Sequence, residues 1–243
     1  MKKLHVKTWR SGILMLLCMS AGIVDVIGYI HLGRVFTANM TGNIVILGMS
    51  FAHVAELSFL RAALACIGFI AGNAAAAILL SGNKAKGFWP ARITLILGIE
   101  LVFYVIFAAS SSPVMSEGLL HVLILLLSSA MGMQTTAARK LSIAGISTTV
   151  LTNNLASVIE DFVAFFRNKF GVKKTSKISG DTWLRMTAVL IYCFGALIGG
   201  VAETYMRFSA IYIPILVTVI ILIIIFTMFR NIDENGERIR SIS

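Results

Sequence analysis

The sequence predicts an all-α polytopic membrane protein with six transmembrane helices and two short re-entrant half-helices, arranged as two inverted repeats. Three observations predict this fold class. Of the 243 residues, 58% are hydrophobic and 13% are charged, which is too apolar for a chain that must also cover itself with a soluble surface. Six apolar stretches are long enough to cross a bilayer. Two similar segments rich in threonine and asparagine follow the first long stretch of each half.

Each long apolar stretch comes close to the roughly 20 residues that a hydrocarbon core of about 30 Å requires. The stretches cover residues 11–30, 62–80, 93–109, 119–138, 186–204 and 209–229. The basic start of the chain imitates a secretory signal, but the apolar run continues past Asp25 without a clean cleavage site, so we interpret it as an uncleaved first helix. Residues 44–52 and 155–166 are also apolar, but each is short or polar at one end. We expect these two segments to enter and leave the membrane by the same face.

An internal repeat supports this division of the chain. The spacing Thr-x3-Thr-x-Asn occurs twice, 111 residues apart, and further polar and glycine positions recur in the same order. The aligned positions are Thr37, Thr41 and Asn43 with Thr148, Thr152 and Asn154; Ser20, Ala21 and Asp25 with Ser129, Ala130 and Gln134; and Gly68 and Gly72 with Gly195 and Gly199. We assign the first repeat to residues 1–113 and the second to residues 114–230, with a basic cytoplasmic insertion at 167–181 and a polar cytoplasmic tail at 231–243.

The distribution of basic residues indicates the topology. With the N-terminus in the cytoplasm and both short segments re-entrant, 18 of the 21 Lys and Arg residues lie inside, whereas two additional crossings would leave 14 inside and 7 outside. Cytoplasmic loops carry an excess of Lys and Arg, so the re-entrant topology is favoured. Three crossings per half then make the two repeats inverted relative to each other. The net charge of +10 needs no nucleic-acid partner to explain it.

The two Thr/Asn segments are the candidate substrate-binding site. Backbone that is irregular at membrane depth must be buried in protein or line a wet cavity, because lipid offers its N–H and C=O groups no partners. Two half-helices that enter from opposite faces would point their positive N-termini at a shared midplane site, which favours an anion or a polar solute. The candidate residues are Thr37, Thr41, Gly42, Asn43, Thr148, Thr152, Asn153 and Asn154.

These polar residues also have a purely structural interpretation. Thr41 or Asn43 in the first segment, and Thr152 or Asn154 in the second, could cap the N-terminus of the helix that follows. Gly42 would allow a ligand or backbone to approach closely, whereas Asn153 at the matching position adds an amide, so the two halves of the site differ chemically.

Acidic residues within apolar segments are the candidates for proton coupling. A charge at membrane depth is costly, so Asp25 and Glu100 are expected to face protein or water. Asp25 could instead brace the first Thr/Asn segment through hydrogen bonds. Gln134 is the neutral counterpart of Asp25 in the repeat, so only one half would titrate at this position.

Glycine pairs at a spacing of four residues indicate closely packed helices. Gly68 and Gly72, like Gly195 and Gly199, could pack within the chain or form the surface of a homodimer. The expected partners are the lipid bilayer and a small polar or anionic solute. No metal or cofactor is expected, because the Cys and His residues have no metal-ligand spacing.

Three classes of function can be compared on these residues. The leading hypothesis is a secondary transporter, with one group of helices rocking against the other around a fixed site. An aquaporin-like channel is the alternative, but the Asn-Pro-Ala turns of such pores are absent here. In those pores the half-helices follow the second crossing of each half, whereas here they follow the first. A membrane scaffold or sensor also remains open. An enzyme is not expected, because neither a Ser-His nor a His-Glu-x-x-His pattern occurs and no catalytic residue can be assigned.

At Ser20-Ala-Gly-x-x-Asp25, Thr41-Gly-Asn43, Met131-Gly-Met-Gln134 and Thr148-x3-Thr152, the sequence resembles the YoaK-like family of bacterial membrane proteins, a domain family of unknown function. The resemblance extends over about residues 14–229. Asn153 departs from it, since a glycine like Gly42 is more typical there. The resemblance implies a multi-pass protein of the bacterial cytoplasmic (inner) membrane, and the charge distribution predicts that both termini are cytoplasmic.

Overall fold

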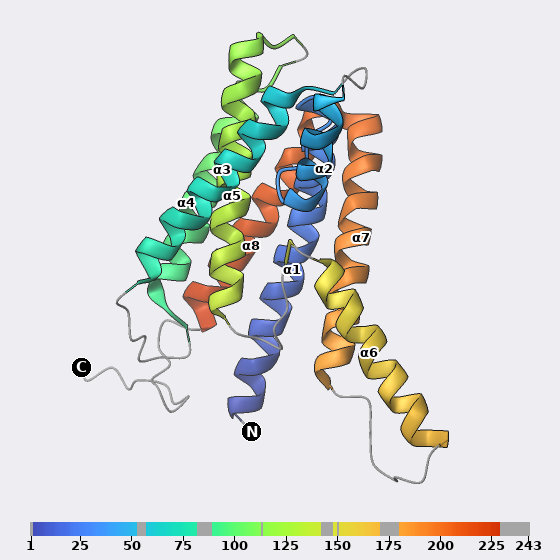
Figure 1. Ribbon diagram of the computed structural model, residues 1–243. Helices are drawn as coiled ribbons and strands as arrows, with labels where there is room; N and C mark the ends of the chain where they lie inside the picture. The colour runs from blue at the N-terminus through green and yellow to red at the C-terminus, as the bar shows by residue number, and fades with distance from the viewer. Residues whose placement is uncertain are drawn as a thin grey trace, which may run out of the picture.

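A computed structural model describes residues 2–52, 57–81, 89–112, 114–141, 148–149, 151–170 and 180–228. Within those ranges every regular element is a helix (Figure 1). The helices are α1 (Lys2–His31), α2 (Met40–Phe51), α3 (Phe59–Leu80), α4 (Ala91–Ser110), α5 (Glu117–Lys140), α6 (Leu151–Phe170), α7 (Gly180–Met206), the 3-10 helix η1 (Arg207–Ile211) and α8 (Tyr212–Met228).

The predicted set of six spans is confirmed. Six helices are long and apolar enough to cross a membrane: Thr8–His31 of α1, all of α3, α4 and α5, Gly180–Tyr205 of α7, and Ser209–Met228, which joins η1 to α8. With 12 residues, α2 is too short to span. The expected basic insertion at 167–181 is partly helical, since α6 continues to Phe170 and α7 begins at Gly180. The rest of that insertion and the tail at 231–243 lie outside the described residues.

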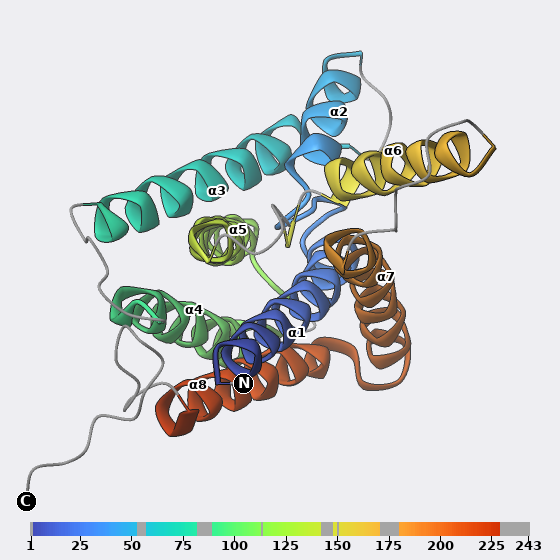
Figure 2. The same ribbon diagram turned by 90° about the horizontal axis from the view of Figure 1, so that it is seen from below.

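α1 and α5 form the centre of the helix assembly. More than half of the apolar window of each is buried, at 67% for α1 and 61% for α5, whereas the other four spans stay at or below 33%. Viewed along the helices, α5 lies beside α3 and α4, and α1 lies between α7 and α8 (Figure 2). The peripheral helices expose large apolar side chains such as Ile67, Ile70 and Ile78 on α3. An apolar outer surface around central helices that carry buried polar side chains suits a lipid environment.

Glycines set the closest helix contacts. A Cβ on Gly72 of α3 would lie 2.0 Å from the carbonyl oxygen of Ser129 on α5, and one on Gly195 of α7 would lie 2.3 Å from the carbonyl oxygen of Met19 on α1. Gly68 and Gly199 are buried against the same two partner helices. All four glycines therefore pack within the chain, which is the first of the two interpretations given above, and the suggested homodimer surface at these positions loses its basis.

α2 and α6 lie between spans that meet at one end of the assembly. Only α2 is short; α6 has 20 residues, as many as α4, so the second segment is longer than the predicted apolar run 155–166. α1 ends and α3 begins at the upper end in Figure 1, and Gly33, just after α1, is in contact with the Arg61 side chain of α3. Gly33 and Arg34 have φ angles of 81° and 64°, so the chain turns back sharply there. At the lower end, α6 begins part-way along α7, passes the start of α7 near its own middle and runs on beyond it (Figure 1). There Asp161 of α6 accepts a hydrogen bond from Thr182 of α7 at 2.6 Å.

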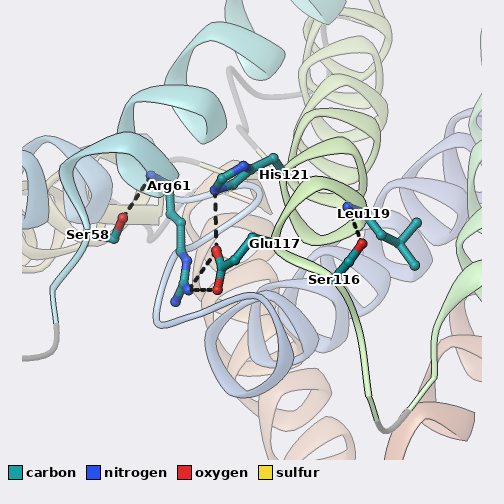
Figure 3. Close-up of polar contacts among 6 residues, drawn as sticks. All are labelled: Ser58, Arg61, Ser116, Glu117, Leu119 and His121. Atoms are coloured by element: carbon teal, nitrogen blue, oxygen red, sulfur yellow. Dashed lines mark hydrogen bonds and ion pairs between the residues drawn. The ribbon is translucent and has the colours of Figure 1, made fainter.

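Polar side chains fix the starts of α3 and α5 next to each other (Figure 3). Ser58 and Ser116 are the N-caps of these helices, each accepting a hydrogen bond from a backbone N–H three residues later. The Arg61 guanidinium contacts both carboxylate oxygens of Glu117, at 2.9 and 3.1 Å, and His121 lies 3.6 Å from the same carboxylate. This cluster ties the entry of α3 to the entry of α5.

Candidate functional site

Asp25 is the centre of the first Thr/Asn segment. Its Oδ1 accepts hydrogen bonds from the backbone N–H groups of Thr37 at 2.8 Å and Ala38 at 2.6 Å. The N–H of Asn39 at 3.4 Å and the Thr37 hydroxyl at 3.2 Å donate to the same oxygen. Oδ2 accepts from the hydroxyl of Tyr192 on α7. Successive N–H groups that converge on one oxygen ahead of a helix form an anion-binding concavity, and here the chain's own carboxylate fills it.

These contacts explain how an acid can be buried in the first span. The Asp25 residue is 3% exposed, so its carboxylate has exchanged water for protein donors. The donors come from the loop ahead of α2 and from α7, and the carboxylate therefore joins three parts of the chain. This is the arrangement of a hydrogen-bond brace, one of the two roles that the sequence leaves open for Asp25.

Asn43 and Asn39 complete the first loop. Asn43 Oδ1 accepts from the N–H of Phe36 at 2.8 Å, and its Nδ2 donates to the Phe36 carbonyl. Asn39 is the N-cap of α2, because its Oδ1 accepts from the N–H of Gly42 at 3.2 Å. The suggestion that Thr41 or Asn43 caps this helix is wrong: α2 begins earlier, and the Asn43 amide is used to hold Phe36.

The other two predicted residues of the first loop differ in exposure. Thr41, in the first turn of α2, is exposed. Gly42 does permit a close approach, but to a group of its own loop, since a Cβ there would lie 2.7 Å from a ring carbon of Phe36. Thr37 and Asn43, by contrast, are fully buried.

The second loop places Thr148 and Thr149 in the interior. Both are buried, and Thr149 Oγ1 lies 3.0 Å from Thr135 Oγ1 on α5, one residue after Gln134. The Thr148 hydroxyl is 0% exposed and has no hydrogen-bond partner among the described residues. This contrasts with Thr37, its counterpart in the repeat, whose hydroxyl donates to Asp25.

The remaining predicted residues of the second loop lie in the first turn of α6. Because α6 begins at Leu151, the cap position falls on residue 150, outside the described residues, and neither Thr152 nor Asn154 can be the cap. Thr152 and Asn153 are exposed, whereas Asn154 is 1% exposed.

Glu100, the second acid singled out from the sequence, lies in a separate buried cluster. Its Oε1 accepts from the Tyr104 hydroxyl at 2.6 Å and from Gln134 Nε2 on α5 at 2.8 Å. All three residues are 0% exposed. Gln134 therefore aligns with Asp25 in the repeat but is hydrogen-bonded to Glu100 of α4 rather than holding a carboxylate against a loop.

Several residues of these clusters were not found from the sequence. Tyr104 follows Glu100 by four residues, a spacing that places both on one helix face and could have been noticed. Tyr192 is 167 residues away from Asp25, and nothing in the sequence joins the two. His31 at the end of α1 is hydrogen-bonded to Glu203 of α7, a further buried acid.

The six apolar spans and the buried polar clusters on their central helices define a polytopic membrane protein. A family model described as a protein of unknown function (DUF1275) matches residues 13–224. The chain is also 43% identical over 237 residues to the UPF0700 transmembrane protein YoaK of Bacillus subtilis (strain 168), which covers 95% of this chain and 98% of that protein. The chain belongs to this family, as the sequence motifs indicate. No solved structure matches it.

Proposed function

We propose that the chain is a secondary transporter, not an enzyme, and that it carries a small polar or anionic solute through a site at the N-termini of two re-entrant half-helices. One observation carries this proposal: the loop ahead of α2 is an anion-binding concavity that the Asp25 carboxylate fills, whereas the repeat has the neutral Gln134 in place of Asp25. A second concavity of the same kind, without a carboxylate of its own, could bind the anionic or polar group of a solute.

The helix pairing supports an inverted repeat. If α1, α2, α3 and α4 are exchanged for α5, α6, α7 and α8, the observed pairs are reproduced: α3 packs on α5 as α7 packs on α1, and α4 packs on α5 as α8 packs on α1. α2 and α6 follow the same rule, because α2 packs on α3 as α6 packs on α7. Repeats related in this way are common in secondary transporters, and their substrates bind near the bilayer midplane between the repeats.

The placement of α2 and α6 supports a re-entrant path. Asp25 lies six residues before the end of α1, and the loop that leads into α2 returns to it. The loop that leads into α6 likewise returns to Thr135, five residues before the end of α5. At a rise of about 1.5 Å per residue, both loops reach roughly 8–9 Å back from the ends of these helices. Each half-helix would then begin within the membrane.

The solute site is assigned to the second loop. Thr148 corresponds to Thr37, and its buried hydroxyl is available as a donor to a solute oxygen or halide. Thr152, Asn153 and the first N–H groups of α6 lie next to it in the chain, at the positive end of the helix. In the first half, the matching donors are already used: the Thr37 N–H donates to Asp25, and Asn43 Nδ2 donates to the Phe36 carbonyl. The two loops would thus serve different purposes, with the first holding the fold and the second binding the solute.

Thr148→Val tests the assignment, and Thr37→Val is its matched control. We would measure the thermal stability of the purified protein in detergent with sodium chloride, acetate, phosphate or sulfate, and then flux of any stabilising anion into vesicles. Loss of one hydrogen bond to a charged group costs about 1.5–3 kcal/mol, so Thr148→Val should raise the apparent Kd of the stabilising anion roughly tenfold or more, as read from the anion concentration needed for the same rise in Tm. The apo stability of this variant should stay close to that of the parent.

Thr37→Val should show the opposite pattern, with lower apo stability and retained anion dependence. The transporter proposal would be wrong if none of a broader panel of small anions and neutral polar solutes stabilised the parent or entered vesicles, which is the result expected of a scaffold. Flux that does not saturate with concentration would favour a channel.

A further inference from the structure

The Glu100–Gln134 pair has an unusual hydrogen-bond balance. Glu100 Oε1 accepts two hydrogen bonds, from Tyr104 at 2.6 Å and from Gln134 at 2.8 Å, whereas Oε2 has no donor among the described residues. Gln134 Oε1 is also buried without a donor. Two acceptors are thus left without partners in two side chains that are already joined by a hydrogen bond.

One proton would satisfy both oxygen atoms. A carboxylic acid and a primary amide are complementary at two points, because the amide N–H donates to the acid carbonyl and the acid O–H donates to the amide carbonyl. The first of these bonds is present, from Gln134 Nε2 to Glu100 Oε1. A proton on Glu100 Oε2 would supply the second. A carboxylate would instead leave a buried charge and two unpartnered acceptors, which is costly at membrane depth.

The charged groups around Glu100 do little to stabilise a carboxylate there. Tyr104 on the same helix is its other donor, and Asp25 of α1, which interacts electrostatically with Tyr104, is another acid. The charged side chains of α5 lie at its ends: Glu117, His121, Arg139 and Lys140. Arg61 of α3 is paired with Glu117, Tyr212 of α8 is exposed, and the Arg207 side chain of η1 is outside the described set. None of the described cations is bonded to Glu100.

We propose that Glu100 carries an exchangeable proton on Oε2, donated to Gln134 Oε1, and that of the two acids Glu100 and Asp25, Glu100 is the one that is protonated. Asp25 is differently placed, because all five of its hydrogen bonds are donated to it and suit a carboxylate. The use of this proton in coupling rests on the proposed transport function. When water enters the site, the proton passes from Glu100 Oε2 to water. Water molecules then donate hydrogen bonds to Glu100 Oε2 and Gln134 Oε1, the two oxygens that had shared the proton.

Infrared spectroscopy of the purified protein in lipid tests the proton directly, without any transport assay. At neutral pH, the parent should show the C=O stretch of a protonated buried carboxylic acid, separate from the carboxylate bands. Glu100→Gln should abolish that band and Glu100→Asp should shift it, whereas Asp25→Asn should leave it in place. Glu100→Gln resembles the neutral acid in shape and can still donate to Gln134, so it should fold.

The absence of the band in the parent at neutral pH would overturn the proposal, as would its loss in Asp25→Asn and persistence in Glu100→Gln. If the band is present but no solute crosses the vesicle membrane, the protonation site stands and the transporter proposal fails. If solute flux is found without the band, the transporter proposal stands and the protonation site at Glu100 fails.

Discussion

Removing the Asp25 carboxylate should destabilise the protein more than any other single change in its polar interior. Asp25→Ala would leave three well-formed donors without an acceptor: the buried N–H groups of Thr37 and Ala38, and the hydroxyl of the partly buried Tyr192. Each unsatisfied buried donor costs about 1–3 kcal/mol, so the two N–H groups amount to roughly 2–6 kcal/mol and the partly buried hydroxyl adds to that. We expect a loss of at least about 3 kcal/mol, since water entering the site would relieve part of the penalty.

Unfolding in mixed micelles by a denaturing detergent, followed by circular dichroism, would measure this loss. Tyr192→Phe removes only one of the donors and should cost about 1.5–3 kcal/mol, the value of one hydrogen bond to a charged group. Thr218→Val is the matched control on α8. It deletes a buried hydroxyl that has no partner among the described residues, and it should change stability by less than about 0.5 kcal/mol.

The reasoning would be refuted if Asp25→Ala unfolded within about 1 kcal/mol of the parent, because the cost of three orphaned donors could not be that small. It would also fail if Thr218→Val were as damaging as Asp25→Ala. In that case burial at membrane depth, rather than hydrogen bonding by the carboxylate, would determine the loss.

Two further predictions concern packing and the outer ion pair. Gly72→Ala should cost about 1–3 kcal/mol, because its Cβ would lie 2.0 Å from the Ser129 carbonyl oxygen, whereas Gly98→Ala, with open space around it, should gain about 0.5–1 kcal/mol from helix propensity. Equal effects of the two changes in the same unfolding titration would contradict the close contact of α3 with α5. Arg61→Ala should cost no more than about 1 kcal/mol, since the Glu117 side chain is 69% exposed and water screens the pair. That loss should shrink in high salt, and a salt-independent loss above about 2 kcal/mol would show that Arg61 acts mainly through its packing on the loop after α1.

The spans could be predicted from the sequence because apolar length is a local property. All six candidate spans were found, although α7 begins at Gly180, six residues before the predicted start, and α6 extends at both ends of the apolar run 155–166. The added residues at the start of α7 and at both ends of α6 are mostly polar, so a search for apolar stretches does not detect them. Helix starts were also misplaced: α2 is capped by Asn39 because the neighbouring Asn43 is used by Phe36, and that choice depends on how the loop folds back.

The candidate site could be predicted only in outline. The repeat brought Asp25, Gln134 and the two Thr/Asn loops to attention, and the possible brace between Asp25 and the first loop could be stated from their order in the chain. Tyr192 could not be found, because α7 reaches Asp25 only through helix packing, in which Gly22 lies against Tyr192 and Gly195 against Met19. The bond between Gln134 and Glu100 likewise depends on the contact of α5 with α4, which no local pattern encodes.

The account depends most on the two half-helices entering from opposite faces, and cysteine accessibility in intact cells tests this directly. In a background with Cys18, Cys66 and Cys193 replaced, single cysteines would be placed at Ala52 after α2, Lys140 at the end of α5 and Gly180 at the start of α7, all of which are exposed. We predict that an impermeant maleimide labels Ala52→Cys from outside and labels Lys140→Cys and Gly180→Cys only after permeabilisation. Labelling of Lys140→Cys and Gly180→Cys from opposite faces would mean that α6 crosses the membrane. Labelling of Ala52→Cys only after permeabilisation would mean that α2 crosses or that the N-terminus is outside, and either result would contradict the predicted topology.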